Sequence, residues 1–196
     1  MAASKSPRAK ALAGLKRLMG RRLTGNDSGP DIAPFGIVPR PKGRNPRDDR
    51  AVALVSVAVI DQGLEAALLT KFRQLAPDDE RAIFSDDSAP LASFDAKVRL
   101  AFALGLLGKQ AWADLTVIRR IRNTFAHSRL QINFDTPEIA DAVGLLTLRE
   151  RWPNMMPTGE TTAREIFMQT SFQYALFLIA LPNGGAESLR SLVLDT

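Results

Sequence analysis

The sequence predicts an all-α protein, a helical bundle of about five main helices preceded by a basic, flexible N-terminal tail. Two observations predict this fold. Apolar residues recur at helical spacing through most of residues 48–181, and proline, glycine and capping residues divide that region into helix-sized stretches. Apolar residues make up 45% of the 196-residue chain, enough to build a core. The length therefore fits one helical domain and a tail.

Residues 1–47 form the basic tail and linker. They hold 11 Lys and Arg residues against two acids, whereas residues 48–196 hold 15 against 19. A basic tail of this kind favours contact with nucleic acid or another anionic surface. The tail residues expected to contact phosphate are Lys16, Arg17, Arg21 and Arg22.

Two parts of this tail differ in pattern. From Ser4 to Leu23, apolar residues recur three and four positions apart among the basic ones, which is typical of a short amphipathic helix. The alternatives for this stretch are solvated disorder and an organellar transit peptide, which is also rich in arginine and poor in acids. Residues 25–47 carry five prolines and four glycines, a composition that indicates a linker.

The helical domain is predicted to span residues 48–196. Its first stretch, 48–75, is too long and too rich in alanine for a strand despite its valines. Ser93 suits the N-cap of a later helix, which we expect Gly108 to end. The predicted helices are 48–75, 77–84, 93–107, 112–127, one beginning at Asp135-Thr136-Pro137-Glu138, and 161–181.

Composition also limits the chemistry. The chain has no cysteine and one histidine, which excludes disulfides and thiolate catalysis and makes a structural zinc site a poor fit. We therefore expect no metal and no cofactor. The sequence predicts no transmembrane segment and no secretory signal, and the absence of cysteine fits a reducing cytoplasm.

The one histidine, His127, ends the run Arg122-Asn123-Thr124-Phe125-Ala126-His127. Histidine exchanges a proton near neutral pH, and arginine binds phosphate oxygens while it stays charged. Arg122, Asn123 and His127 could therefore cut a phosphodiester without a metal, with Arg122 on the phosphate and His127 as acid or base. On a helix, Arg119, Asn123 and His127 share one stripe, and the positive patch is extended by Arg120 and Arg129.

A structural interpretation of the same residues stays open. His127 and Asn123 would then brace the helix end, where a cation is favourable. Arg122 would pair with an acid such as Asp114 or Asp135. The paired arginines Arg119 and Arg120 would form a solvated helix face.

The stretch from Phe84 to Asp135 resembles the mannitol operon repressor family of bacterial regulators. The matching features are a Pro-Leu turn before Phe94, an Ala-Leu-Gly-Leu helix end, Asp-Leu before a doubled Ile-Arg, and Arg-Asn-x-Phe-Ala-His-Ser. The likeness continues more weakly over residues 50–150. The resemblance places the chain in the HEPN superfamily of helical nucleotide-binding domains, whose Arg-polar-spacer-His signature falls on Arg122, Asn123 and His127.

This resemblance implies two kinds of function. Many superfamily members are metal-independent endoribonucleases whose active unit is a dimer, and others are non-catalytic regulators. Mannitol repressor relatives are regulators without a recognisable helix-turn-helix. We therefore expect a transcriptional regulator that acts as a helical homodimer, binds DNA or RNA and has a protein partner, either a transcription factor or an antitoxin. The first alternative is an endoribonuclease that uses Arg122 and His127, and the second is a non-catalytic protein-interaction module.

Overall fold

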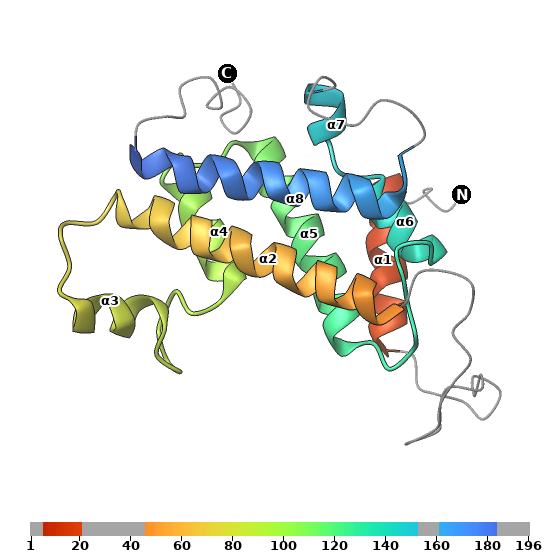
Figure 1. Ribbon diagram of the computed structural model, residues 1–196, viewed down its shortest axis with the longest axis horizontal. Helices are drawn as coiled ribbons and strands as arrows, with labels where there is room; N and C mark the ends of the chain where they lie inside the picture. The colour runs from red at the N-terminus through yellow and green to blue at the C-terminus, as the bar shows by residue number, and fades with distance from the viewer. Residues whose placement is uncertain (1–5, 21–45, 153–160, 184–196) are drawn as a thin grey trace, which may run out of the picture.

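The computed structural model describes residues 6–20, 46–152 and 161–183. Within these ranges every regular element is a helix, which confirms the all-α prediction (Figure 1). The elements are α1 (Pro7–Gly20), α2 (Pro46–Leu69), α3 (Pro77–Phe84), α4 (Phe94–Ala103), α5 (Lys109–His127), α6 (Pro137–Val143), α7 (Leu148–Arg151), α8 (Ala163–Ala180) and a 3-10 turn at Leu181–Asn183.

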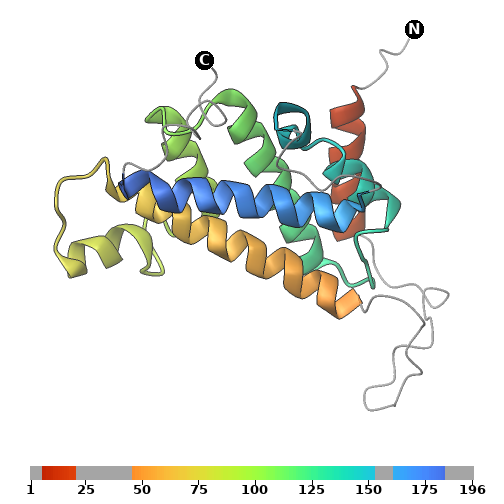
Figure 2. The same cartoon turned by 45° about the horizontal axis from the view of Figure 1, so that its top comes forward.

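Helices α2 and α8 lie side by side and run in the same direction (Figures 1 and 2). Near their beginnings, Arg164 of α8 donates from Nε to Oδ1 of the buried Asp49 of α2 at 3.0 Å. Further along, Gly63 of α2 lies directly against Leu178 and Ala175 of α8. The missing side chain of Gly63 lets the two backbones approach closely, so the pair forms one layer of the molecule.

Helices α4 and α5 lie behind this layer in Figure 1 and pack against α2. The core lies between the two layers, where Phe125, Phe134 and Phe167 are fully buried with successive ring centroids 4.9 and 5.1 Å apart. Aromatic rings of this size supply much of the apolar area that the fold buries.

Helix α1 differs from the expected free tail. It is the amphipathic helix that the apolar spacing predicts, and its residues Leu15 and Leu18 are buried. It packs against α5 and α6, and Arg8 donates from Nη2 to the carbonyl oxygen of Ala113 at 3.2 Å. Residues 7–20 are therefore packed on the helical body, because the apolar stripe of α1 covers part of the core. The linker at 21–45 lies outside the described residues.

Three helix boundaries differ from the sequence prediction by three residues or more: the ends of α4 and α2, and the start of α5, which begins at Lys109 rather than residue 112. Helix α4 begins after its predicted cap, with Ser93 accepting from the amide of Ala96, but it ends at Ala103. Gly105 follows with a φ of +71°, a conformation that favours glycine. Gly108 does not end that helix; it is the N-cap residue of α5. The first long helix likewise ends at Leu69 rather than residue 75.

The last helix begins at Ala163, two residues after its predicted start at 161. Thr162 and Glu165 form a capping box at the N-terminus of α8, each side chain satisfying a backbone amide of the other. At α6 the N-cap residue is Thr136, whose hydroxyl bonds Asn133 rather than the helix. Among the described helices one, over Asp48–Leu69, is long and apolar enough to cross a membrane by length and composition.

Candidate functional site

Helix α5 carries the Arg-Asn-x-x-x-His run and fixes it to the core. Its apolar stripe, including Leu115, Ile118 and Phe125, is buried. Arg122 and Asn123 are half-buried beside that stripe, and His127 is exposed as the last residue of the helix. The helix therefore holds the run on a rigid element.

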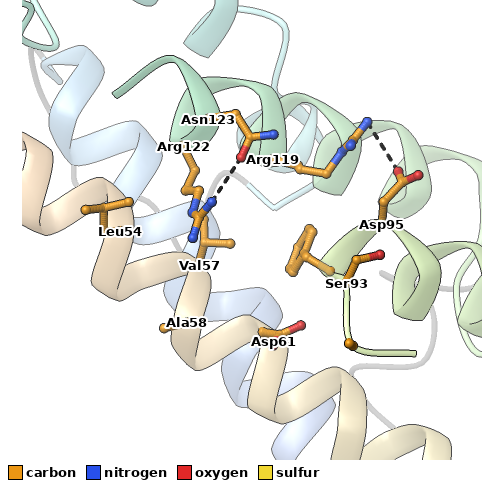
Figure 3. Close-up of a pocket in the computed structure, with 11 residues that line it drawn as sticks. Leu54, Val57, Ala58, Asp61, Ser93, Asp95, Arg119, Arg122 and Asn123 are labelled. Atoms are coloured by element: carbon orange, nitrogen blue, oxygen red, sulfur yellow. Dashed lines mark hydrogen bonds and ion pairs between the residues drawn. The ribbon is translucent and has the colours of Figure 1, made fainter. Parts of the chain in front are cut away.

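A cavity of about 380 Å³ lies between α2, the beginning of α4, and α5 (Figure 3). We call it the α2–α5 cavity. Nη1 of Arg122 donates to Oδ1 of Asn123 at 3.1 Å, and Nη2 of Arg119 lies 3.2 Å from Oδ1 of Asp95. The lining residues are Leu54, Val57, Ala58, Asp61, Ala92, Ser93, Phe94, Asp95, Arg119, Arg122 and Asn123.

The charges of this cavity balance. Two arginines face it with two carboxylates, and Asp95 is already paired with Arg119 while Asp61 is paired with Lys97. Arg122 makes no ion pair within the described residues, and in Figure 3 its side chain extends from α5 toward α2. Arg122 is therefore the cation in this cavity that is available to an anionic group.

His127 is not among the residues that line this cavity. It lies one turn beyond Asn123 along the same stripe, at the exposed end of α5. The structure thus brings Arg122 and Asn123 together and leaves His127 outside the enclosure. An enzyme that used all three would act on a substrate lying across the helix end, in contact with solvent.

Arg122 does not pair with Asp114. That carboxylate is buried on the same helix and binds Arg151 and Tyr174 instead, with Arg151 Nη2 3.2 Å and Tyr174 Oη 2.8 Å from its Oδ2. The expectation of an Arg122–Asp114 pair is therefore wrong, because α7 and α8 supply closer partners to Asp114. Asp135 is exposed.

A second cavity, of about 330 Å³, lies between α1 and α5. We call it the α1–α5 cavity. It is lined by Leu12, Leu15, Lys16, Met19, Arg119, Arg120 and Asn123. Arg119 and Asn123 also line the α2–α5 cavity, so the polar stripe of α5 lies between the two. The packing of α1 on the body thus brings Lys16 to the same cavity as Arg119 and Arg120, which lie about a hundred positions further along the chain.

The remaining predicted cations are scattered around this region. Arg17 and Arg129 are exposed. Arg50 was not singled out from the sequence, and it donates from Nη2 to the carbonyl oxygen of Ser128 at 3.1 Å, which adds a cation beside the end of α5. Arg21 and Arg22 lie outside the described residues.

A buried polar cluster joins α5, α7 and α8. Asp114 accepts from the amide of Thr147 at 3.0 Å and from Arg151 and Tyr174, and Nη2 of Arg151 lies 2.7 Å from the Tyr174 hydroxyl. Burial raises the pKa of Asp114, although the bonds from Thr147 and Tyr174 and the charge of Arg151 oppose that rise. Burial and the neighbouring carboxylate likewise hold the pKa of Tyr174 well above its usual value.

Lys97 is a second buried ionic group that sequence reasoning missed. Its Nζ lies 3.1 Å from Oδ2 of Asp61 and 2.7 Å from Oε2 of Glu65. The spacing of Asp61 and Glu65, one helical turn apart, could have indicated a shared cation. It could not have indicated Lys97, which is on another helix. No group of three His, Asp or Glu residues suited to a metal occurs in the described ranges.

Comparison with known proteins gives one family. A family model described as mannitol repressor matches residues 47–178. That range includes both arginines of the α2–α5 cavity and His127, and excludes α1. No curated protein and no solved structure matches the chain.

Proposed function

Because the chain belongs to the mannitol repressor family, we propose that it is a repressor-like regulator that binds nucleic acid at the α1–α5 cavity. One observation carries this proposal: Lys16 of α1 and Arg119 and Arg120 of α5 line the same cavity. Cations gathered on one surface attract the phosphate backbone, and their binding releases counterions. Helix α1 would act as a folded part of the binding surface.

Two of the three cations that line this cavity are available to bind phosphate. Within the described residues neither Lys16 nor Arg120 makes an ion pair, whereas Arg119 is held by Asp95. We assign contact with phosphate to Lys16 and Arg120, and assign to Arg119 the positioning of the α5 stripe. Arg17 and Arg129 extend the positive surface. Phosphate contacts fix a protein on a duplex without reading bases, so this mode needs no helix-turn-helix.

The test is binding of a fluorescent DNA duplex and of an RNA of the same sequence, measured by anisotropy at one ionic strength. Lys16→Ala and Arg120→Ala should each weaken binding by roughly 3- to 10-fold, the size of one lost phosphate contact. The matched control is Arg73→Ala, because Arg73 is an exposed arginine just after α2. It belongs to the segment between α2 and α3, which lies at the opposite end of the molecule from α1 in Figure 1. His127→Ala should leave binding unchanged. Equal losses in Arg120→Ala and Arg73→Ala would refute the assignment.

The proposal includes the other features that the resemblance implies. The regulator would act in the cytoplasm as a homodimer, and a transcription factor or an antitoxin would be its protein partner. The resemblance to regulators without a helix-turn-helix supports a partner that supplies sequence specificity. Which nucleic acid is bound is an outcome of the anisotropy test.

A metal-independent endoribonuclease is the second candidate function. It is favoured by the position of Arg122, whose guanidinium bonds Asn123 and faces the α2–α5 cavity with no ion pair among the described residues. Arg122 would hold the scissile phosphate, and His127 would move a proton at the 2′-hydroxyl or the leaving oxygen. Cleavage of a mixed-sequence RNA in EDTA tests it. If the wild type cuts the RNA and both Arg122→Ala and His127→Ala abolish the cutting, the chain is a metal-independent endoribonuclease. A pure interaction module would neither cut nor bind.

A further inference from the structure

The layer formed by α2 and α8 leaves one broad apolar face uncovered. Val55 of α2 is 62% exposed and Phe172 of α8 is 59% exposed, large fractions for side chains of this kind. The exposed apolar residues of this layer are Val55, Val59, Met168, Phe172, Leu176 and Ile179. We call this set the α2–α8 face.

These residues form one continuous surface. On α8 they are spaced by four, four and three positions, which places them on one stripe of the helix. On α2, Val55 and Val59 are one turn apart. The two stripes meet at the seam between the helices, where Ile179 lies against Gly63 of α2. Both helices form the front of the molecule in Figure 1, and the exposure of these side chains places the face on the outside of the molecule.

The face is also free of charge. Neither 51–60 on α2 nor 166–183 on α8 contains a Lys, Arg, Asp or Glu. The nearest acids of α2, Asp61 and Glu65, turn aside to bind Lys97. A neutral face offers no charge by which a foreign partner could be selected, and no like charges that would oppose pairing with its own copy.

We propose that the α2–α8 face is the contact between two copies of this chain, related by a two-fold axis. In such a contact the same patch serves both copies, so it must complement itself. The six side chains expose on the order of 500 Å² of apolar surface, a large part of the roughly 800 Å² that each partner contributes to a standard interface. The paired layers of two copies would form a four-helix core.

This contact has a consequence for the motif. Helix α5 lies behind the α2–α8 layer in Figure 1, so a dimer formed through the layer keeps the two copies of Arg122 and His127 apart. The α1–α5 cavity stays open in each copy. The inference rests on the homodimer of the proposed function and names its contact face. Nucleic-acid binding and dimer formation are measured separately, so each can fail without the other.

The experiment is sedimentation of the full chain at concentrations up to about 100 µM, where even weak contacts assemble. The wild type should sediment at twice its mass of 21.4 kDa. Leu176→Asp should raise the dissociation constant of the dimer by roughly 100-fold, because the contact would bury an unpaired carboxylate. Leu104→Asp is the matched control, since Leu104 and Leu176 are exposed to nearly the same extent, 43% and 44%, and Leu104 follows α4 and belongs to neither helix of the face.

A second measurement tests the contact without the aspartate variant, which could fail to fold. The chain has no cysteine, so Phe172→Cys supplies a single thiol that can crosslink only to its counterpart in another copy. Fast oxidative crosslinking of Phe172→Cys, with little for Leu104→Cys, supports the proposal. A wild type that stays monomeric at the highest concentration would overturn it, as would a dimer that Leu104→Asp dissociates and Leu176→Asp does not.

Discussion

At the scale of single residues, Asp114 shows most clearly what burial does to a charge. Its side chain is fully buried and accepts hydrogen bonds from Thr147, Tyr174 and Arg151. Even so, burial dominates and the pKa of its carboxyl lies above the ordinary 3.8. A buried charge of this kind is stabilising only with all its partners in place, and the loss of one leaves an unpaired group in the core.

The raised pKa of Asp114 gives a prediction for the pH dependence of stability. Folded Asp114 takes up a proton at a higher pH than unfolded Asp114, so its contribution to the free energy of unfolding is largest at low pH. That contribution is lost as the pH rises from 3.8 through the raised pKa. Asp114→Asn removes the titration. The free energy of unfolding of the wild type minus that of the variant should therefore fall as the pH rises through this window and stay constant above it.

Urea unfolding of both proteins across that pH range measures the difference. A difference that grows with pH would mean that the bonds to Asp114 outweigh its burial, contrary to the structure. The control is Asp78→Asn, because Asp78 is exposed on α3.

At the scale of elements, the close approach of α2 and α8 depends on Gly63. A Cβ at this position would lie 2.9 Å from the Cβ of Leu178, closer than two such atoms approach. Gly63→Ala should therefore destabilise the fold by about 1–3 kcal/mol through overpacking, against a gain of up to about 1 kcal/mol in helix propensity. Thermal and urea unfolding measure the net change.

Gly20→Ala is the control for that substitution. Nothing lies within 4 Å of a Cβ at Gly20, so alanine there should leave stability unchanged or slightly raised. Equal stability of Gly63→Ala and the wild type would show that α2 and α8 can separate without cost. That outcome would contradict a rigid α2–α8 layer.

Elements also show where sequence reasoning succeeds and where it stops. Local signals predicted α3 and the Ser93 cap, because each depends on residues a few positions apart. The Thr162–Glu165 capping box is a signal of the same kind that the sequence prediction did not use. The end of α4 was misplaced, since Gly105 and Gly108 carry similar local signals and only the structure shows which one adopts a positive φ. Helix α1 was expected as an amphipathic helix, but its docking depends on contacts with residues about a hundred positions away.

The candidate site, too, was predictable only where it depends on residues close together in the sequence. Helical periodicity placed Arg119, Asn123 and His127 on one stripe of α5. It could not show that Arg119 is held by Asp95 of α4, that Asp114 is held by Arg151 and Tyr174, or that Lys16 joins the stripe. Each of these contacts joins elements whose packing is decided by the whole core, so spacing along the chain does not reveal it.

At the scale of the whole molecule, the distribution of charge explains why α1 matters. Residues 1–47 carry a surplus of nine positive charges and the remainder a deficit of four. The docking of α1 onto α5 and α6 brings part of that surplus to the arginines of α5. The α2–α8 face, by contrast, is neutral and apolar. The molecule thus separates a surface suited to phosphate from one suited to a second copy of itself.

The central claim is that α1 and α5 bind nucleic acid together, and the salt dependence of binding tests it most directly. The logarithm of the association constant for duplex DNA should fall linearly with the logarithm of salt concentration. In the double variant Lys16→Ala, Arg120→Ala the magnitude of that slope should be smaller by about 2, one for each lost phosphate contact, and Arg73→Ala should keep the wild-type slope. A double variant with the slope and affinity of the wild type would contradict the account.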